Sequence, residues 1–301
     1  MKTIPLTLLL ALVAGRPLAS RAQSPTPTPS VLGHEPRNEA EAQMQNKYAD
    51  QVSPELYAKW VAYIDSKSPE EQAWLRTLED QLGSFYFPAY VKDKDRFSPA
   101  YNPAADAWAY VKDDPALPRV LIVGDSISRA YTAAARQALA GKANVHRAPA
   151  NCGPTKKFLD LGEIWLDQNG SNKWDIVIVN FGIHDGKNPN GYEDRLRQVI
   201  GRLKKTGAKV FWVRTTPWGK DATVFDGEAG DASSITNPAS DSVASAEDLK
   251  VIDAHAIMAP MISTALNRKD FTHWSPEAYD TLGKAVAAAI EPDLATKKSS
   301  P

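Results

Sequence analysis

Residues 119–128 read Arg-Val-Leu-Ile-Val-Gly-Asp-Ser-Ile-Ser, and this stretch decides the fold. Its four consecutive branched apolar residues predict a short buried strand. Gly124 interrupts that strand, and a helix is predicted over 129–140. Ser126 therefore lies at the carboxyl end of a strand in a parallel sheet, which is the edge where open α/β sheets bind ligands.

The position of Ser126 suits a nucleophile. Its hydroxyl is expected close to a helix N-terminus, whose backbone N–H groups favour developing negative charge. Asp125 precedes it and is expected to support the site. Gly-Asp-Ser is also a common turn sequence, so catalysis requires a base, a group that orients the base, and donors for an oxyanion.

His273 has the best context for a base among the five histidines. Asp270 precedes it by three residues, and on a tight turn this spacing lets the carboxylate reach Nδ1 of the imidazole. Nε2 would then face Ser126. A helix is predicted immediately afterwards, with Ser275 as its N-cap and Pro276 at its first position. The same Asp-x-x-His pattern could instead be a surface pair that caps this helix.

Two more polar segments follow predicted strands. Residues 174–185 contain a predicted buried strand that is followed by Gly-Ile-His-Asp, and residues 150–155 read Ala-Asn-Cys-Gly-Pro-Thr. In the second segment Gly153 can present a bare backbone N–H. Both segments are also compatible with ordinary loops between strands and helices.

Strands and helices alternate from residue 117 onward, which predicts βαβ units and a parallel sheet. The predicted strands are 119–123, 143–148, 174–181, 209–215 and 249–253, and the predicted helices are 129–140, 157–167, 192–206 and one that starts at 276.

The order of these segments resembles the SGNH/GDSL hydrolase superfamily over residues 117–292. The resemblance implies a three-layer α/β/α sandwich with a five-stranded, flavodoxin-like parallel sheet. It also implies that Ser126 is the nucleophile, His273 the base and Asp270 its partner, with the N–H groups of Ser126 and Gly153 as oxyanion donors. Two-step acyl transfer of this kind needs no metal and no cofactor.

One position departs from the superfamily pattern. Residues 182–185 read Gly-Ile-His-Asp where the superfamily usually has Gly-x-Asn-Asp. His184 could donate an N–H to the oxyanion, with Asp185 holding its tautomer. Alternatively, Asn180 or Asn151 could supply that donor.

The N-terminal third has a different composition. Residues 1–22 resemble a secretory signal peptide, because a basic start, an apolar run and a small-x-small site follow one another. Residues 23–45 are expected to be a Pro/Thr-rich linker, 46–116 a helical extension packed on the hydrolase domain, and 293–301 a disordered tail. We therefore expect a secreted or periplasmic protein.

The net charge limits the classes of partner that this protein is expected to bind. The formal net charge of −1 over 301 residues becomes more negative after signal cleavage, which removes three basic residues. No basic patch with interleaved aromatic residues is visible, so nucleic acid is not an expected partner. The oligomeric state cannot be read from the sequence, and we expect no membrane span.

Two segments could contribute to substrate binding. The aromatic run 85–90 could line a groove or pack the extension on the main domain. Residues 217–245 show little periodicity and are expected to form a loop above the site, with Trp218 and Phe225 as candidate substrate contacts.

The remaining reactive side chains have structural interpretations. Cys152 is the only cysteine and is expected to be a small buried residue. His146 and His255 are expected to be hydrogen-bonded structural histidines, and His34 falls in the linker.

The sequence thus predicts a serine esterase that hydrolyses O-acyl esters, in particular O-acetyl esters on carbohydrate. Two alternatives are an SGNH-type O-acyltransferase and a non-catalytic carbohydrate-binding protein on the same scaffold. A lipase or thioesterase is less favoured, because no long apolar lid segment is present.

Overall fold

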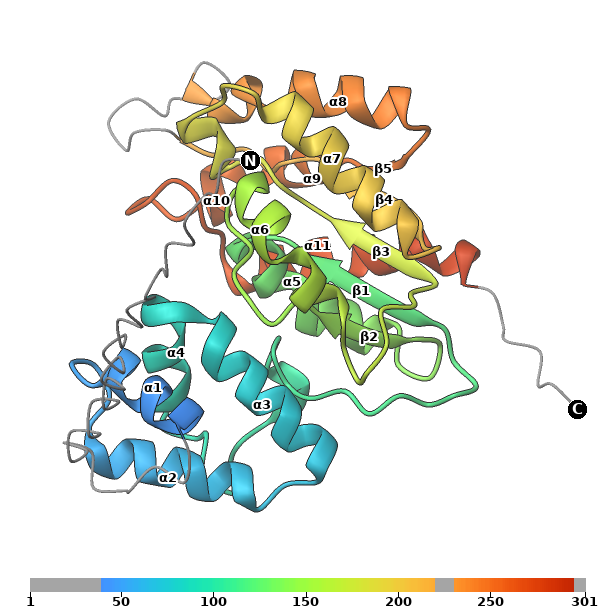
Figure 1. Ribbon diagram of the computed structural model, residues 1–301. Helices are drawn as coiled ribbons and strands as arrows, with labels where there is room; N and C mark the ends of the chain where they lie inside the picture. Colours follow the sequence, from blue (N-terminus) through green and yellow to red (C-terminus); the bar gives the residue numbers. More distant parts are fainter. Residues whose placement is uncertain (1–38, 220–229, 295–301) are drawn as a thin grey trace, which may run out of the picture.

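The computed structural model describes residues 39–219 and 230–294 (Figure 1). Five parallel strands form one sheet in the order β2-β1-β3-β4-β5. They are β1 (Arg119–Val123), β2 (Asn144–Arg147), β3 (Ile176–Val179), β4 (Lys209–Val213) and β5 (Lys250–Ile252). Each lies within a predicted strand, so the predicted five-stranded parallel sheet is confirmed.

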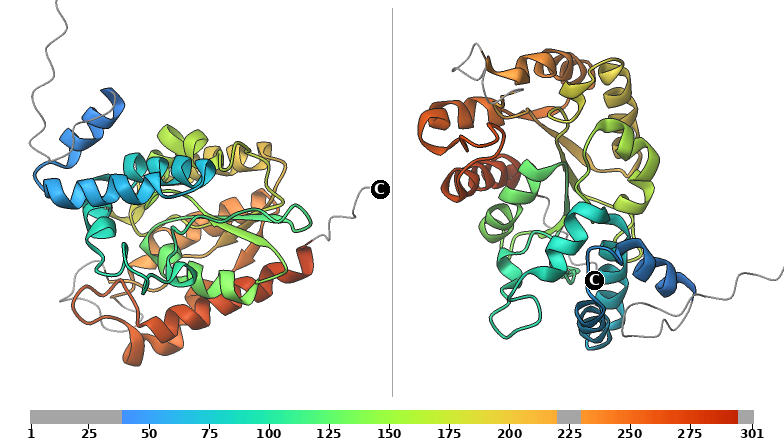
Figure 2. Two further views of the ribbon diagram at one scale, coloured as in Figure 1. Left: turned by 90° about the horizontal axis from the view of Figure 1, so that it is seen from below. Right: turned by 90° about the vertical axis from the view of Figure 1, so that its left-hand side faces the viewer.

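Helices cover both faces of this sheet, which gives the predicted three layers (Figures 1 and 2). Along β1, Val120 and Ile122 contact one helical layer, whereas Leu121 and Val123 contact the other. The first layer contains α5 (Ser126–Ala138), α9 (Ala254–Met258) and α11 (Pro276–Ile290), and the second contains α6 (Thr155–Leu166), α7 (Tyr192–Lys205) and α8 (Asn237–Ala246). The short helix α10 (Ile262–Ala265) precedes the loop that carries His273.

The N-terminal helices form a unit with its own core. They are α1 (Glu39–Tyr48), α2 (Pro54–Asp65), α3 (Pro69–Gln81) and α4 (Gly83–Lys92). Ser53 and Ser68 cap α2 and α3, each accepting a backbone N–H at 3.3 Å. The core is rich in aromatic rings, because Trp60 packs edge-on against both Phe87 and Tyr90. This unit therefore has enough buried apolar surface to hold its four helices together.

Three tryptophans connect the helical unit to the sheet domain. The indole N–H of Trp74 donates to the carbonyl of Trp108 (2.8 Å), and that of Trp108 donates to the carbonyl of Ala148 (3.2 Å). On the neighbouring side Trp165 donates to Oε1 of Gln81 (2.8 Å). The helical unit is thus packed directly on the loop that follows β2.

Two element boundaries differ from the prediction. Helix α1 begins at Glu39, inside the range 23–45 that the Pro/Thr-rich composition assigned to a linker. The sequence after residue 38 is rich in Glu, Ala and Gln, which are good helix formers. Helix α5 begins at Ser126 and not at 129, because the Asp125 carboxylate caps it by accepting the N–H of Ile127 (3.0 Å).

The prediction of a loop over 217–245 is wrong in its second half. Helix α8 starts inside this range, after a short 3-10 helix at Ala232–Ile235. Its Ala- and Ser-rich sequence has few large apolar residues, which hid the helical period. Trp218 is only 2% exposed and packs in the core, so it is not a surface contact for substrate. Phe225 lies outside the described residues.

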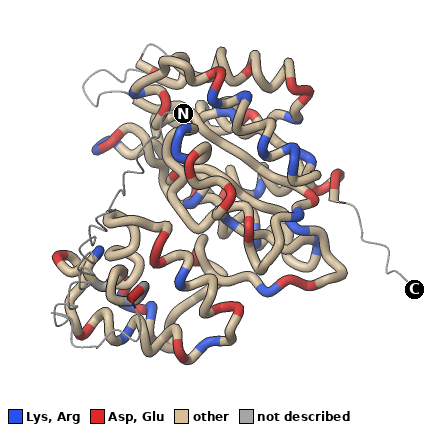
Figure 3. The backbone as a smooth tube through the Cα atoms, in the orientation of Figure 1, with Lys and Arg blue, Asp and Glu red and all other residues tan. Residues whose placement is uncertain are grey.

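Acidic and basic residues are interspersed over both units (Figure 3). None of the helices in the described ranges combines the length and the apolar content that a bilayer span requires. The expectation that nucleic acid is not a partner stays a prediction.

Candidate active site

The candidate site lies where the strand order reverses. β1 is the strand from which the chain proceeds to β2 on one side and to β3 on the other. The loops after β1 and β3 therefore diverge at the carboxyl edge of the sheet, which is the position where open α/β sheets bind ligands. Ser126 follows β1, and His184 follows β3.

Ser126 is the first residue of α5, so its backbone N–H points out of a helix N-terminus. Its residue exposure is only 6%. The turn that carries it is tight, because a Cβ on Gly124 would meet Ser128 Oγ at 2.8 Å and the Asn180 carbonyl at 3.1 Å. Glycine is thus required at position 124. We call residues 124–126 the nucleophile turn.

His273 faces Ser126, as predicted. Its Nε2 lies 2.8 Å from Ser126 Oγ, and its Nδ1 lies 3.0 Å from Asp270 Oδ2. These distances allow a proton to pass from the hydroxyl to Nε2 while the carboxylate holds the proton at Nδ1. Ser126, His273 and Asp270 therefore have the geometry of a nucleophile, a base and an orienting acid.

The turn between Asp270 and His273 holds the acid in place. Asp270 Oδ1 accepts the backbone N–H groups of Thr272 and His273, both at 3.0 Å. Partial burial favours a higher pKa for this carboxyl, but these N–H donors and the imidazole of His273 outweigh it and lower the pKa below its ordinary value. The carboxylate is thus ionised at neutral pH. Phe271 between them has φ +50°, a left-handed conformation that this turn imposes.

Two backbone N–H groups are oriented for an oxyanion. Gly153 has φ +62°, so a side chain there would be strained. Neither its N–H nor that of Ser126 has a hydrogen-bond partner among the described residues. Cys152, just before Gly153, donates its own N–H to the Gly124 carbonyl (3.1 Å), which joins this loop to the nucleophile turn. The two free donors therefore belong to segments that are hydrogen-bonded together.

The predicted link between Asp185 and His184 is wrong. Asp185 Oδ2 accepts the backbone N–H of Thr155 (2.9 Å), and its Oδ1 accepts the Thr155 hydroxyl (2.6 Å) and Arg195 (3.1 Å). Both oxygens are therefore occupied, and the residue joins the loop after β3 to the start of α6. Asp185 supports the site by fixing the Gly153 loop.

His184 is half-buried and lies close enough to Asp125 to interact with it electrostatically. Burial raises the pKa of the Asp125 carboxyl, while His184, the Ile127 N–H, Arg147 and His273 oppose that rise. Asp125 Oδ2 is buried and has no hydrogen-bond partner in the described part of the chain. Asp125 is thus better placed than Asp185 to influence the imidazole of His184.

The two alternative amide donors differ. Asn180 donates one N–H of its Nδ2 to the Val213 carbonyl (2.7 Å), so it connects β3 to β4 and keeps one N–H on the same amide nitrogen. Its role as an oxyanion donor stays a prediction. The carbonyl of Asn151 accepts from Lys157 Nζ (3.1 Å), and its buried Oδ1 has no partner among the residues described. A role for Asn151 stays a prediction.

Replacing His184 tests the third oxyanion donor. We expect His184→Ala to lower kcat for p-nitrophenyl acetate by roughly 10²–10³-fold with a smaller change in KM, because the donor acts on the transition state. His184→Asn restores the usual superfamily residue and should keep most of the activity. Wild-type kcat in His184→Ala would show that the imidazole is not a donor.

Arg147 is a functional residue that the sequence analysis missed. This fully buried guanidinium at the end of β2 donates to the carbonyls of Gly124 (3.1 Å) and Asp125 (2.8 Å) in the nucleophile turn. It also donates to the carbonyls of Ala148 (3.1 Å) and Ala150 (2.7 Å), just before Gly153. One side chain therefore connects the nucleophile turn to the loop that carries the second oxyanion donor. An arginine at the end of a predicted strand was the only signal in the sequence.

Cys152 is fully buried, as predicted. Burial raises the pKa of its thiol to about 11, although Arg147 and the Gly124 backbone oppose the rise. We expect iodoacetamide at about pH 8 to leave Cys152 unmodified in the native protein and to alkylate it after unfolding in urea. Mass spectrometry of both samples checks this. Fast native labelling with loss of activity would instead make Cys152 an accessible site residue.

The other histidines have structural partners. His146 Nε2 lies 2.6 Å from Asp113, and His255 Nε2 lies 2.6 Å from Asp231. The prediction of hydrogen-bonded structural histidines is thus confirmed for both, and His34 lies outside the described residues. Within residues 39–219 and 230–294, no group of three His, Cys, Asp or Glu side chains is placed to hold a metal ion.

Comparisons with known proteins agree with this geometry. The sequence pattern of the GDSL-like Lipase/Acylhydrolase family matches residues 122–281, which is more than half of the chain. The chain therefore belongs to this family of SGNH hydrolases, and it is an ester hydrolase. No curated protein matches it significantly.

Several solved structures are similar at low identity. A lipase/acylhydrolase from Enterococcus faecalis is 19% identical over 60% of this chain and 100% of its own, with a TM-score of 0.49. An acetyl xylan esterase is 16% identical over 57% of this chain and 99% of its own, also at 0.49. A catalytic mutant of an acetylxylan esterase from Geobacillus stearothermophilus is 15% identical over 57% of this chain and 94% of its own, with a TM-score of 0.47. At such identities and scores, no conclusion about substrate follows.

Proposed function

We propose that this protein is a serine esterase that removes O-acetyl groups from carbohydrate through an acyl-enzyme on Ser126. The observation that carries the proposal is the continuous contact from Ser126 Oγ to His273 Nε2 (2.8 Å) and from His273 Nδ1 to Asp270 (3.0 Å). The family supports the reaction class, because its members are acylhydrolases.

The reaction proceeds in two steps. Ser126 Oγ attacks the ester carbonyl while His273 Nε2 takes its proton, and the resulting oxyanion accepts the N–H groups of Ser126 and Gly153, with His184 as a third donor. Collapse of this intermediate breaks the bond to the sugar oxygen, which leaves as an alcohol with the proton from His273. Water, deprotonated by the same imidazole, then attacks the acyl carbon and releases acetate and free Ser126.

Carbohydrate is the substrate class that best fits the chain as a whole. The expected signal peptide at 1–22 would bring the protein to a secreted or periplasmic location, where polysaccharides are accessible.

Free acetate is the product that tests the proposal. Wild type, Ser126→Ala and the control Ser263→Ala, an exposed serine near the site loop, are incubated with acetylated xylan, acetylated pectin and p-nitrophenyl acetate. Acetate from wild type and Ser263→Ala, but not from Ser126→Ala, is the expected result. Acetyl transfer to an added sugar with little free acetate would favour an acyltransferase, and glycan binding without turnover would favour a binding protein.

A further inference from the structure

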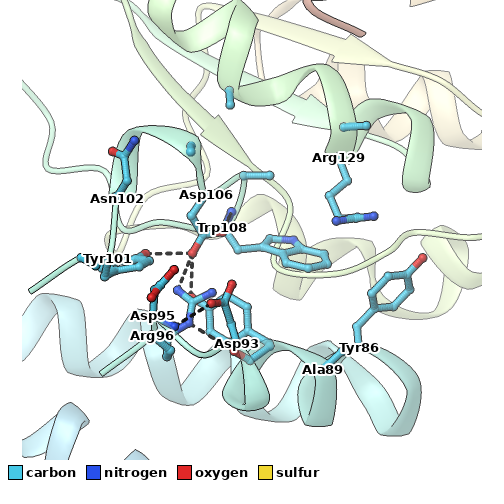
Figure 4. A pocket seen from close by; sticks show the side chains of 16 residues that line it. Tyr86, Ala89, Asp93, Asp95, Arg96, Tyr101, Asn102, Asp106, Trp108 and Arg129 are labelled. Carbon is cyan, nitrogen blue, oxygen red and sulfur yellow. Dashed lines mark hydrogen bonds and ion pairs between the residues drawn. The ribbon is translucent and has the colours of Figure 1, made fainter. Parts of the chain in front are cut away.

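A cavity of about 500 Å³ lies between the helical unit and α5 (Figure 4). This size is in the range of small-molecule sites. Tyr86 and Tyr90 of α4, Tyr101, Trp108 and Arg129 of α5 line it, together with several alanines that leave it open. The aromatic run 85–90 therefore contributes both to a cavity and to packing. Tyr86 lines this cavity, whereas Phe87 is buried in the core of the helical unit.

Arg129 connects this cavity to the candidate active site. It lies three residues after Ser126 on α5, and side chains at this spacing share a helix face with Cβ atoms about 5–6 Å apart. Tyr86, which lines the cavity, also interacts electrostatically with both places. Burial raises the pKa of its hydroxyl, Arg129 opposes this rise, and Asp125 in the nucleophile turn adds to it. A group bound beside Arg129 would therefore be adjacent to an ester bound at Ser126.

In the described part of the chain, the guanidinium of Arg129 has no anionic partner. It lies 5.6 Å from the ring centroids of both Tyr86 and Trp108, and Figure 4 shows it directed toward these rings. Among the described residues it has no hydrogen bond or ion pair, and its Nε is buried without a partner. By contrast, Arg96 in the same cavity donates to Asp106 at 2.6 Å. A partly buried cation without a counterion is energetically unfavourable. An anionic group of a ligand would supply the missing counterion.

The rest of the cavity suits a sugar ring. Tyr86 and Trp108 contribute aromatic surface to the lining, and the carboxylates of Asp93 and Asp95 can accept hydroxyl donors. Figure 4 places Asp95 beside Arg96 and Tyr101, at the end of the cavity away from Arg129. A carboxylate on the ligand can therefore meet Arg129 while its hydroxyl groups meet the acidic end.

We propose that this cavity binds a sugar unit that carries a carboxylate, next to the acetylated unit, and that Arg129 holds the carboxylate. The planar guanidinium matches a carboxylate in a bidentate manner, which lysine and glutamine cannot do. The inference deepens the proposed function, because it names acidic glycans as the preferred esters. It rests on that function only for the ester-cleaving step.

Binding tests the cavity independently of hydrolysis. Calorimetry on Ser126→Ala protein uses trigalacturonate and a glucuronic-acid-substituted xylotriose as acidic probes and xylotriose as the neutral one. We expect at least one acidic probe to bind more tightly than xylotriose, and Arg129→Gln in the same background to weaken it about tenfold or more. Arg129→Lys should recover part of that loss. The matched control is Lys94→Gln, which removes one exposed positive charge from the helical unit outside the cavity lining.

Activity separates this inference from the proposed function. Wild type should have a higher kcat/KM for acetylated acidic oligosaccharides than for acetylated neutral ones. Arg129→Gln should reduce this preference about tenfold, because it raises KM for the acidic substrate. If acetate is released but neither acidic probe binds, or if Arg129→Gln binds them as the parent does, the cavity assignment is wrong and the esterase stands. If no ester is cleaved but acidic probes bind through Arg129, the cavity assignment holds and the esterase fails.

Discussion

Ser126→Ala and His273→Gln are each expected to lower kcat for ester hydrolysis by on the order of 10⁴–10⁶-fold. The hydroxyl and the imidazole are in contact at 2.8 Å and act on the same proton, so neither is useful without the other. The double variant should consequently be no slower than either single one. This lack of additivity distinguishes a catalytic pair from two residues that independently support the fold.

Initial rates for the two single variants and the double variant provide the measurement, with thermal unfolding as the control for folding. Asp270→Asn should lower kcat less than either single variant does, because the side chain of Asp270 is 42% exposed and water can approach Nδ1 of His273. Losses that multiply in the double variant would contradict a shared role, and a full-rate Ser126→Ala would remove the proposed nucleophile.

Arg147→Met is expected to have the largest effect on stability. The substitution keeps most of the buried volume but removes the donors for four backbone carbonyls and for Ser128 Oγ. The carbonyls of Gly124, Asp125 and Ala148 each keep a second donor, whereas that of Ala150 loses its main one. Hydrogen bonds that involve a charged group contribute about 1.5–3 kcal/mol each, so the loss of this set should lower the free energy of unfolding by at least ~3 kcal/mol. Trp108, whose ring lies 5.4 Å from the Arg147 guanidinium, would lose one of its two cationic neighbours and keep Arg129.

The same variant should impair catalysis in a particular way. Arg147 connects the nucleophile turn to the Gly153 loop, so its loss should lower kcat more than it raises KM, even at temperatures where the variant is folded. Arg147→Lys retains a charge but reaches fewer carbonyls, and should restore part of the stability and part of kcat. Urea unfolding and steady-state kinetics measure both effects. Wild-type stability and kcat in Arg147→Met would show that the network is dispensable.

The sheet could be predicted from the sequence because β1, β3 and β4 contain short apolar runs and because strand-like and helix-like segments alternate. The pairing of His273 with Ser126 was also predictable, because the carboxyl ends of the strands and the start of the last helix meet at one edge. Ser126 and His273 are 147 residues apart, and their 2.8 Å contact is what this pattern predicted.

The sequence could not indicate the residues whose roles depend on tertiary contacts. Asp185 was adjacent to His184, which suggested a pair, yet both its oxygens bind Thr155 and Arg195. Asn180 similarly binds across the sheet to β4, a partner fixed only by strand order. Trp218 was expected at the surface because its loop is polar, whereas the ring packs in the core.

The most direct test of the account is the site of covalent labelling by a fluorophosphonate. This reagent bonds to a serine oxygen with loss of fluoride, and it needs the nucleophile to be activated by a base. The account predicts a single adduct on the peptide that contains Ser126, absent in Ser126→Ala and formed far more slowly in His273→Gln. An adduct on another serine, or labelling at an unchanged rate in His273→Gln, would contradict the assignment of Ser126 and His273 as nucleophile and base.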